Sequence, residues 1–215
     1  MAALIAVGSA AAEPQSASSA DSTASQPAGY VERLRMLAQL QTLNSDLLSH
    51  DSATAVLQAL CDRREAGGPR IRARHVAVED DAETLAAVRR DLKAASNEPV
   101  RHRRVELLCG EAVLSKADNW YLPDRLTGEM NRALETTETP FGVAVRALAF
   151  QRRTLSAKLL FEPLPAGWEA RPPATFEAPI HPPPEVLQHR AVLQTPDGRP
   201  FSLLVETYTD KVLRP

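Results

Sequence analysis

Residues 100–109, with the sequence VRHRRVELLC, could bind a charged ligand. If this stretch is a β-strand, its side chains alternate between two faces, and both faces then carry charged as well as apolar residues. On one face Arg104 and Glu106 lie beside Leu108, which suggests an enclosed polar site. A buried guanidinium needs a partner, and its planar set of donors fits a carboxylate best. The alternative is an edge strand with solvated arginines, and spacing alone favours this simpler interpretation. The opposite face would carry Arg101, Arg103, Val105, Leu107 and Cys109.

Glu206 is a second candidate for chemistry. In the strand expected at residues 201–209 it shares a face with Leu204 and Tyr208. An acid flanked by large apolar residues near the end of a core strand is either paired with a base or used chemically.

The sequence Thr139-Pro140-Phe141-Gly142 predicts the start of a helix, with Thr139 as N-cap and Pro140 at the first helical position. The free N–H groups of Phe141 and Gly142 would then point outward and attract an anion. A helix start without any ligand explains the motif equally simply, and the motif alone favours that interpretation.

The cysteines and histidines predict no metal site. The five histidines are scattered without ligand spacing, and neither cysteine lies in a CxxC motif. Cys61 and Cys109 could form one disulfide in an exported chain. We expect instead two buried, unpaired thiols, because nothing in the sequence brings the two residues together.

The first half of the chain predicts an alternation of helices and strands. Leucines at three- and four-residue intervals indicate an amphipathic helix at residues 30–48, and Asp51 or Ser52 caps a second one. Gly110-Glu111 reads as a tight turn between two strands of a hairpin. The expected elements are a strand at 71–78, a helix at 80–93, strands at 100–109 and 112–122, and a helix at 124–134.

The second half predicts three more strands. Residues 150–161 alternate basic and apolar side chains, and residues 162–185 form a proline-rich crossing. Strands at 186–195 and 201–209 are joined by the turn Pro196-Asp197-Gly198. The fold class is therefore α+β, an antiparallel sheet of about six strands with helices packed mainly on one side.

Composition describes one globular domain at residues 30–215. The chain has 215 residues, is 44% hydrophobic and 24% charged, and has a net charge of -2. A near-neutral charge gives no reason to expect a nucleic acid partner. No apolar run is long enough to span a membrane, and we expect a monomer.

The N-terminal residues predict export. Residues 1–12 resemble the apolar core of a signal peptide that ends at Ala10-Ala11-Ala12, although a basic leading segment is missing. Residues 13–29 are rich in Ser, Ala, Gln and Pro and form a disordered linker. The expected location is the periplasm or the outside of the cell, and the alternative is an Ala-rich tail on a cytoplasmic protein.

In order along the chain, these segments resemble the chorismate pyruvate-lyase family, whose members convert chorismate to 4-hydroxybenzoate and pyruvate. The likeness runs from about Leu43 to the C-terminus. The segments that carry it are RVELLC ending at Cys109, the strand ending at Pro123, TPFG at 139–142, and a terminal hairpin with GRP at 198–200 and Val205-Glu206. The resemblance implies an internal ligand cavity and no cofactor.

The resemblance also implies site residues. Arg104 would hold the ring carboxylate, the main-chain N–H of Phe141, beside Gly142, would be a second donor, and Glu206 would face the hydroxyl end of the ring. Arg104 and Glu206 would be the catalytic pair. Ala53 stands where the family has a larger methionine in a flap over the site, and this departure weakens the expected closure.

Three functions compete at this point. The first is a cofactor-free carbon–oxygen lyase acting on chorismate, and this is the expected one. The second is a binding protein, without turnover, for a small aromatic carboxylic acid. The third is a structural protein that has lost the cavity. Export argues against the lyase, because chorismate is made and used inside the cell, whereas the presence of both Arg104 and Glu206 argues for it.

Overall fold

The computed structural model describes residues 28–64, 68–171, 176 and 179–213. Its centre is a six-stranded sheet in the order β1-β2-β3-β6-β5-β4, with every neighbouring pair antiparallel. The expected α+β class and strand number are confirmed. The signal-like segment at 1–12 and the linker up to residue 27 lie outside the described residues. The strands are β1 (Arg72–Val76), β2 (Arg101–Cys109), β3 (Ala112–Tyr121), β4 (Gln151–Leu159), β5 (Glu185–Gln194) and β6 (Pro200–Thr209).

Both expected hairpins are present. β2 and β3 are joined at Gly110 and Glu111, where Gly110 has a φ of 58° that a side chain would disfavour. β5 and β6 are joined by a turn in which the N–H of Gly198 donates to the carbonyl of Thr195 at 2.8 Å. These two hairpins pair through β3 and β6, and this pairing decides which side chains share a face.

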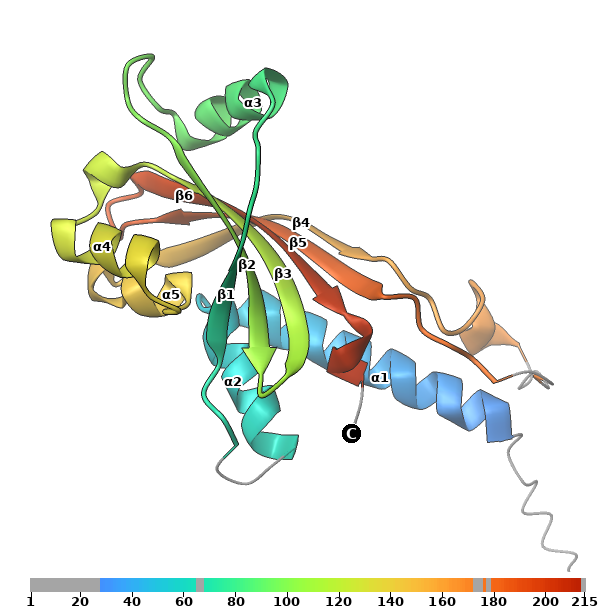
Figure 1. Ribbon diagram of the computed structural model, residues 1–215. Helices are drawn as coiled ribbons and strands as arrows, with labels where there is room; N and C mark the ends of the chain where they lie inside the picture. Colours follow the sequence, from blue (N-terminus) through green and yellow to red (C-terminus); the bar gives the residue numbers. More distant parts are fainter. Residues whose placement is uncertain (1–27, 65–67, 172–175, 177–178, 214–215) are drawn as a thin grey trace, which may run out of the picture.

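The sheet has two different faces. We call the face that bears Val105, Ala117 and Glu206 the pocket face, because these residues are cross-strand partners on β2, β3 and β6. The helices α1 (Ala28–Ser49), α2 (Ala53–Arg64), α4 (Gly128–Thr136) and α5 (Phe141–Ala144) pack on it. We call the other face the α3 face, since α3 (Ala82–Leu92) packs there against Trp120 and Leu203. In Figure 1, α3 lies apart from the other four helices.

Side-chain caps fix two of the helix starts. Asp81 precedes α3, and its Oδ1 accepts from the N–H of Thr84 at 2.7 Å. Thr127 precedes α4 in the same way and accepts from Met130. The expected helix at 124–134 is therefore displaced: Pro123–Arg125 form a 3-10 turn, and the helix starts only after the Thr127 cap.

The helix expected after Thr139 differs more. α5 has only four residues, its N-cap is Pro140 rather than Thr139, and no side chain caps it. The hydroxyl of Thr139 instead accepts from that of Thr137 at 2.8 Å. A single turn of helix has a small dipole, so the anion attraction expected from this helix start is largely lost.

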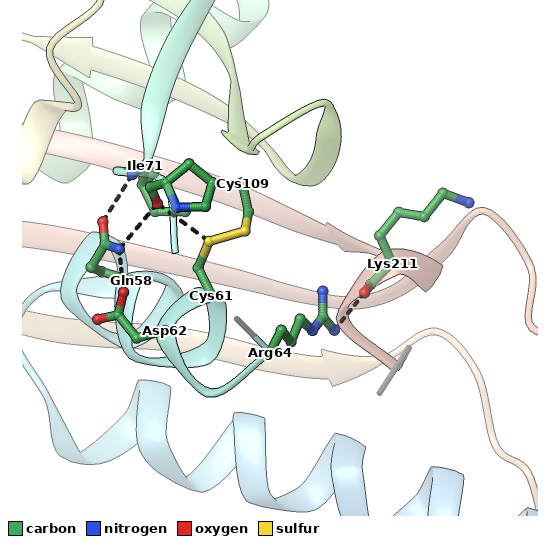
Figure 2. Close-up of a disulfide and its surroundings, with 8 residues drawn as sticks. Gln58, Cys61, Asp62, Arg64, Ile71, Cys109 and Lys211 are labelled. Atoms are coloured by element: carbon green, nitrogen blue, oxygen red, sulfur yellow. Dashed lines mark hydrogen bonds between the residues drawn. A yellow bond between two sulfur atoms is a disulfide. The ribbon is translucent and has the colours of Figure 1, made fainter. Parts of the chain in front are cut away.

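A disulfide joins Cys61 of α2 to Cys109 at the end of β2, with the Cα atoms 5.9 Å apart. Our expectation of two unpaired thiols is wrong. The 48 residues that separate the cysteines in sequence hid a contact made only in the folded chain. Figure 2 shows the bridge beside Gln58, whose Oε1 accepts from the N–H of Ile71 at 2.8 Å. The bridge and this hydrogen bond hold α2 against the sheet.

Candidate functional site

A pocket lies between the pocket face of the sheet and the first turns of α2 and α5. It contains about 380 Å³ of space free of atoms, including the part that opens to solvent. Its walls are mainly apolar, with a few polar groups that converge on one side, which is the usual make-up of a small-molecule site. The lining residues are Asp51, Ser52, Ala53, Thr54, Val105, Leu107, Ala117, Asn119, Phe141, Gly142, Phe150, Arg152, Leu193, Leu204 and Glu206.

A buried ion pair forms the polar end of the pocket. Arg152 Nη2 lies 2.6 Å from Glu206 Oε2, and the two side chains are only 2% and 8% exposed. The Tyr208 hydroxyl also donates to this oxygen, at 3.3 Å. Burial alone would lower the pKa of Arg152, but the charge of Glu206, the hydrogen bond to it and contributions from Tyr208 and Asp51 together raise that pKa. The pair is therefore charged.

Strand register positions the pair. Glu206 is the cross-strand partner of Ala117 on one side and of His189 on the other, so it points to the pocket face. Arg152 is the second residue of β4 and reaches across β5 to meet it. The expectation that Glu206 is either paired or used is met by this pairing.

Sequence reasoning missed Arg152 as a site residue. Arg152 and Arg153 are neighbours in a strand, so one of them has to face the covered side of the sheet. The alternation of residues 150–161 therefore indicated one covered arginine, but it did not indicate which of the two it is. The structure buries Arg152 and leaves Arg153 exposed.

Asp51 ties the entrance of the pocket to β4. Its Oδ1 accepts from the main-chain N–H of Arg152 at 2.8 Å, across 101 residues of sequence. The turn between α1 and α2 is thereby fixed beside the ion pair. The sequence offered Asp51 or Ser52 as the cap of α2. In the structure Ser52 Oγ accepts from the N–H of Ala55 at 3.3 Å, and Asp51 makes the contact with β4 instead.

His189 is completely buried beside the ion pair. Its Nε2 lies 2.8 Å from Asn44 Oδ1, and an amide oxygen only accepts, so Nε2 carries the proton. Burial, assisted by the charge of Arg152, lowers its pKa to about 4, although Glu206 opposes the shift. His189 is therefore neutral near pH 7.

The structure brings together four of the five predicted site residues. Ala53, Phe141, Gly142 and Glu206 all line the pocket. Gly142 lies so close to Ser52 that an added Cβ would be 3.1 Å from the Ser52 hydroxyl oxygen. The first turns of α2 and α5 therefore meet here at van der Waals distance.

Arg104, the fifth, is not in the pocket, and its expected role is wrong. Its cross-strand partner is Asp118, whose own partner is Val205, so Arg104 and Glu206 lie on opposite faces of the sheet. The Arg104 side chain is 43% exposed, and its Nε donates to Asp118 Oδ1 at 2.6 Å. Arg104 cannot hold a ligand that contacts Glu206.

The polar side chains around Arg104 form a separate structural cluster on the α3 face. His102 bridges two carboxylates, with Nδ1 2.6 Å from Asp80 and Nε2 2.7 Å from Asp118. Burial alone would raise the pKa of Asp118, but hydrogen bonds from His102 and Arg104 lower it. This cluster fixes the segment between β1 and α3 to the sheet, and it explains His102 and Arg104 of the central strand without a ligand.

No group of three metal-binding side chains occurs in the part of the chain that the structure describes. Within the same residues, no helix is long and apolar enough to cross a membrane.

No protein-family model matches the sequence. A relative covers almost the whole chain: the uncharacterized protein y4mC of Sinorhizobium fredii is 45% identical over 217 residues, which span 99% of this chain and 89% of y4mC.

Several solved structures share part of the fold. PhnF from Mycobacterium smegmatis has a TM-score of 0.46 and 18% identity, over 78% of this chain and 67% of PhnF. The ligand-binding domain of a proposed GntR-family transcriptional regulator from Bordetella bronchiseptica has a TM-score of 0.40 and 18% identity, over 68% of this chain and 86% of that domain. YydK of Bacillus subtilis, a possible transcriptional regulator, has a TM-score of 0.39 and 13% identity, over 66% of this chain and 58% of YydK. The likeness is too low to support a functional argument.

These findings correct the expected family. The relative that matches almost the whole chain is an uncharacterized protein, and the similar structures include regulators and one of their ligand-binding domains. The expected membership of the chorismate pyruvate-lyase family is wrong, because it rested on short motifs and on a role for Arg104 that the sheet does not allow.

Proposed function

Since the chain belongs to the family of the uncharacterized protein y4mC of Sinorhizobium fredii, whose name carries no activity, we propose a function from the pocket itself. The pocket binds a small organic molecule that carries a carboxylate or a similar acceptor group, and it does so without turnover.

One observation carries the proposal. Two buried polar atoms of the lining have no hydrogen-bond partner among the described residues, Arg152 Nε and Asn119 Nδ2, and both are donors. A buried donor without an acceptor costs free energy, so a ligand that supplies acceptor oxygens is stabilised there. A carboxylate provides two such oxygens and suits a guanidinium.

An aromatic carboxylic acid suits the remaining walls. Phe141 and Phe150 line the pocket together with Leu107 and Leu204, so a flat apolar ring would contact ring and aliphatic carbon on most sides. The enclosed space of the pocket is narrow, and a ring needs additional room, which the turn at residues 52–54 in its wall can provide. We therefore expect binding to be accompanied by a small movement at this turn.

Turnover is not part of the proposal. Glu206 Oε2 already accepts from Arg152 and Tyr208, and the arginine required by the lyase expectation lies on the other face. Incubating the purified full chain with chorismate should therefore produce no 4-hydroxybenzoate above the uncatalysed rate. Production that the Glu206→Gln variant loses would establish a lyase and contradict this proposal.

Calorimetric titration of the full chain with 4-hydroxybenzoate tests the binding. We expect saturable binding that the double variant Arg152→Gln/Glu206→Gln weakens by about tenfold or more, since it removes a charged hydrogen-bond donor. Changing both partners avoids leaving one charge buried alone. Arg153→Gln, one residue away and exposed, is the matched control and should bind as the wild type does. Equal binding by all three proteins would rule out the Arg152 site.

Two further properties belong to the proposal. The disulfide supports an oxidising location, either the periplasm or the cell exterior, because such bonds rarely persist in reducing cytosol. Cell fractionation with thiol labelling should recover the chain outside the cytoplasm without free thiols; a cytoplasmic chain with both thiols labelled would contradict export. We also propose that the chain acts as a monomer.

A further inference from the structure

A second cavity lies near the β1 edge of the sheet, and residues of β1, β2 and α4 line it from both faces. We call it the basic cleft. It contains about 640 Å³ of space free of atoms, including the part that opens to solvent. Three arginines and one glutamate line it, so their charges sum to +2 before the two histidines are counted. By the same count the pocket described above has one arginine and two carboxylates, a sum of −1. The basic cleft is lined by His75, Val76, Val78, Arg101, His102, Arg103, Arg104, Tyr121, Leu134 and Glu135.

Arg103 differs from the other two arginines of the basic cleft in its hydrogen bonding. Two of the three arginines that line it have carboxylate partners: Arg101 pairs with Glu135 and Arg104 with Asp118. Arg103 is only 5% exposed, and its Nη2 donates to the carbonyl of Thr139 at 3.0 Å. Its Nε and Nη1 have no partner among the residues that the structure describes.

A buried guanidinium in this state is incompletely satisfied. Taking a charge out of water costs free energy unless the charge is paired. Burial lowers the pKa of Arg103 to about 10, so the group keeps its charge at neutral pH. The Nε–H of a guanidinium is parallel to an N–H of Nη2, whereas Nη1 lies on the opposite side, so the two free donors of Arg103 point in different directions. An oxyanion can accept a charge-assisted hydrogen bond from either of them.

We propose that the basic cleft binds a small oxyanion that accepts a hydrogen bond from an unpaired donor of Arg103, Nη1 or Nε. The anion would be a phosphate, a sulfate or the like, held at the inner end of the cleft with Arg101 contributing charge near the opening. This site is separate from the pocket that contains Arg152.

The approach to Arg103 passes His75. The His75 side chain is exposed, and its Nε2 lies 3.4 Å from Arg103 Nη2 and 3.0 Å from the carbonyl of Thr139. A single ring nitrogen cannot accept from Arg103 and donate to Thr139 at once, so one of these two contacts is unsatisfied. Movement of this imidazole would open the guanidinium to an anion at little cost.

Titration of the full chain with sodium phosphate at constant ionic strength tests the proposal. We expect saturable binding that Arg103→Gln weakens by about tenfold or more, because a charged hydrogen-bond donor is lost. Arg103→Lys keeps the charge but not the planar guanidinium, and it should bind phosphate with an affinity between those of the wild type and Arg103→Gln. Arg153→Gln is the control and should bind phosphate as the wild type does. Unchanged binding in Arg103→Gln, or no phosphate binding by the wild type, would overturn the proposal.

Two further measurements keep the test decisive. If Arg103→Gln does not fold, Arg101→Gln, at a half-exposed position, should still weaken phosphate binding several-fold by lowering the charge of the cleft. The double variant Arg152→Gln/Glu206→Gln should bind phosphate normally, which separates this site from the proposed function. Competition between phosphate and 4-hydroxybenzoate would place both in one site and contradict a separate anion site.

Discussion

The Arg152–Glu206 pair shows how one buried charge depends on another. Each side chain is almost fully enclosed, and neither could remain charged there alone without a large cost. The pair is therefore expected to matter for stability as well as for binding.

Removing only Arg152 should destabilise the chain strongly. Arg152→Met leaves Glu206 buried without its cation, which typically costs about 3–5 kcal/mol. The double variant Arg152→Met/Glu206→Gln should recover much of this loss, and Arg153→Met should change stability by less than about 0.5 kcal/mol. Urea unfolding measures all three, and a double variant no more stable than the single one would contradict the argument.

His189 predicts a dependence of stability on pH. Its pKa is lowered to about 4 in the folded chain from an ordinary 6.5, so between these values the unfolded chain binds the extra proton. The stabilising effect is complete above pH 6.5, falls as the pH drops from 6.5 to 4, and is absent below that. The loss amounts to roughly 3 kcal/mol.

The measurement is unfolding free energy against pH for the wild type and His189→Gln. The carboxylates contribute to both curves in the same way, so the difference between the curves isolates the histidine. A difference that does not change between pH 6.5 and 4 would show that His189 is not held neutral.

At the scale of elements, the disulfide fixes α2, whose first turn forms one wall of the pocket. Cys61 lies near the end of α2, while Ala53 and Thr54 at its start line the pocket. The bridge joins this helix to β2, which supplies Val105 and Leu107 to the same pocket. One covalent bond thus links two walls of the site.

Reduction of the bridge should lower stability and weaken ligand binding together. Closing a loop of this length reduces the entropy of the unfolded chain by an amount worth about 4 kcal/mol, and measured losses are typically 2–4 kcal/mol. Urea unfolding with and without reductant measures the effect, and Cys61→Ala/Cys109→Ala should not respond to reductant. Unchanged stability on reduction would show that the bridge does not constrain the unfolded chain.

The elements themselves could be predicted in large part from sequence. The turn at Gly110 and the turn at Gly198 both follow from local turn residues, and so do the strands that they join. The two missed details, the late start of α4 and the shortness of α5, concern helix ends. The cap at Thr127 competes with Pro123 for the start, and sequence periodicity does not decide between them.

The site could be predicted only in part from the sequence, because the register between neighbouring strands determines which side chains share a face of the sheet. The two-residue period of β2 correctly places Arg103 and Arg104 on opposite faces of the sheet. It does not reveal which of the two arginines lies on the same face as Glu206. That depends on the pairing of Ala117 with Glu206 across two other strands. The prediction that Cys61 and Cys109 are unpaired was wrong for the same reason, because a contact between distant parts of the sequence leaves no local pattern.

At the scale of the whole molecule, β4 is an edge strand of the sheet. Leu155 on β4 and Leu160, just after its end, are exposed. Such an edge invites another strand unless charges prevent it. Arg153 and Lys158 are exposed on β4. A symmetric antiparallel pairing that places one opposite the other would bring like charges together.

The chain is accordingly expected to sediment as a monomer. Replacing both Arg153 and Lys158 with threonine should raise the dimer fraction in analytical ultracentrifugation, because the repulsion is removed while the exposed leucines remain. A wild-type dimer whose fraction the double substitution leaves unchanged would show that Arg153 and Lys158 do not prevent pairing along β4.

The central claim is that two unsatisfied donors, Arg152 Nε and Asn119 Nδ2, receive the ligand's acceptor oxygens. Nitrogen-15 NMR of the full chain during titration with 4-hydroxybenzoate observes both groups directly. We predict that the Arg152 Nε–H and the Asn119 side-chain amide signals shift together and saturate at one ligand concentration, while those of Arg153 stay in place. Saturable binding that moves neither signal would contradict the claim.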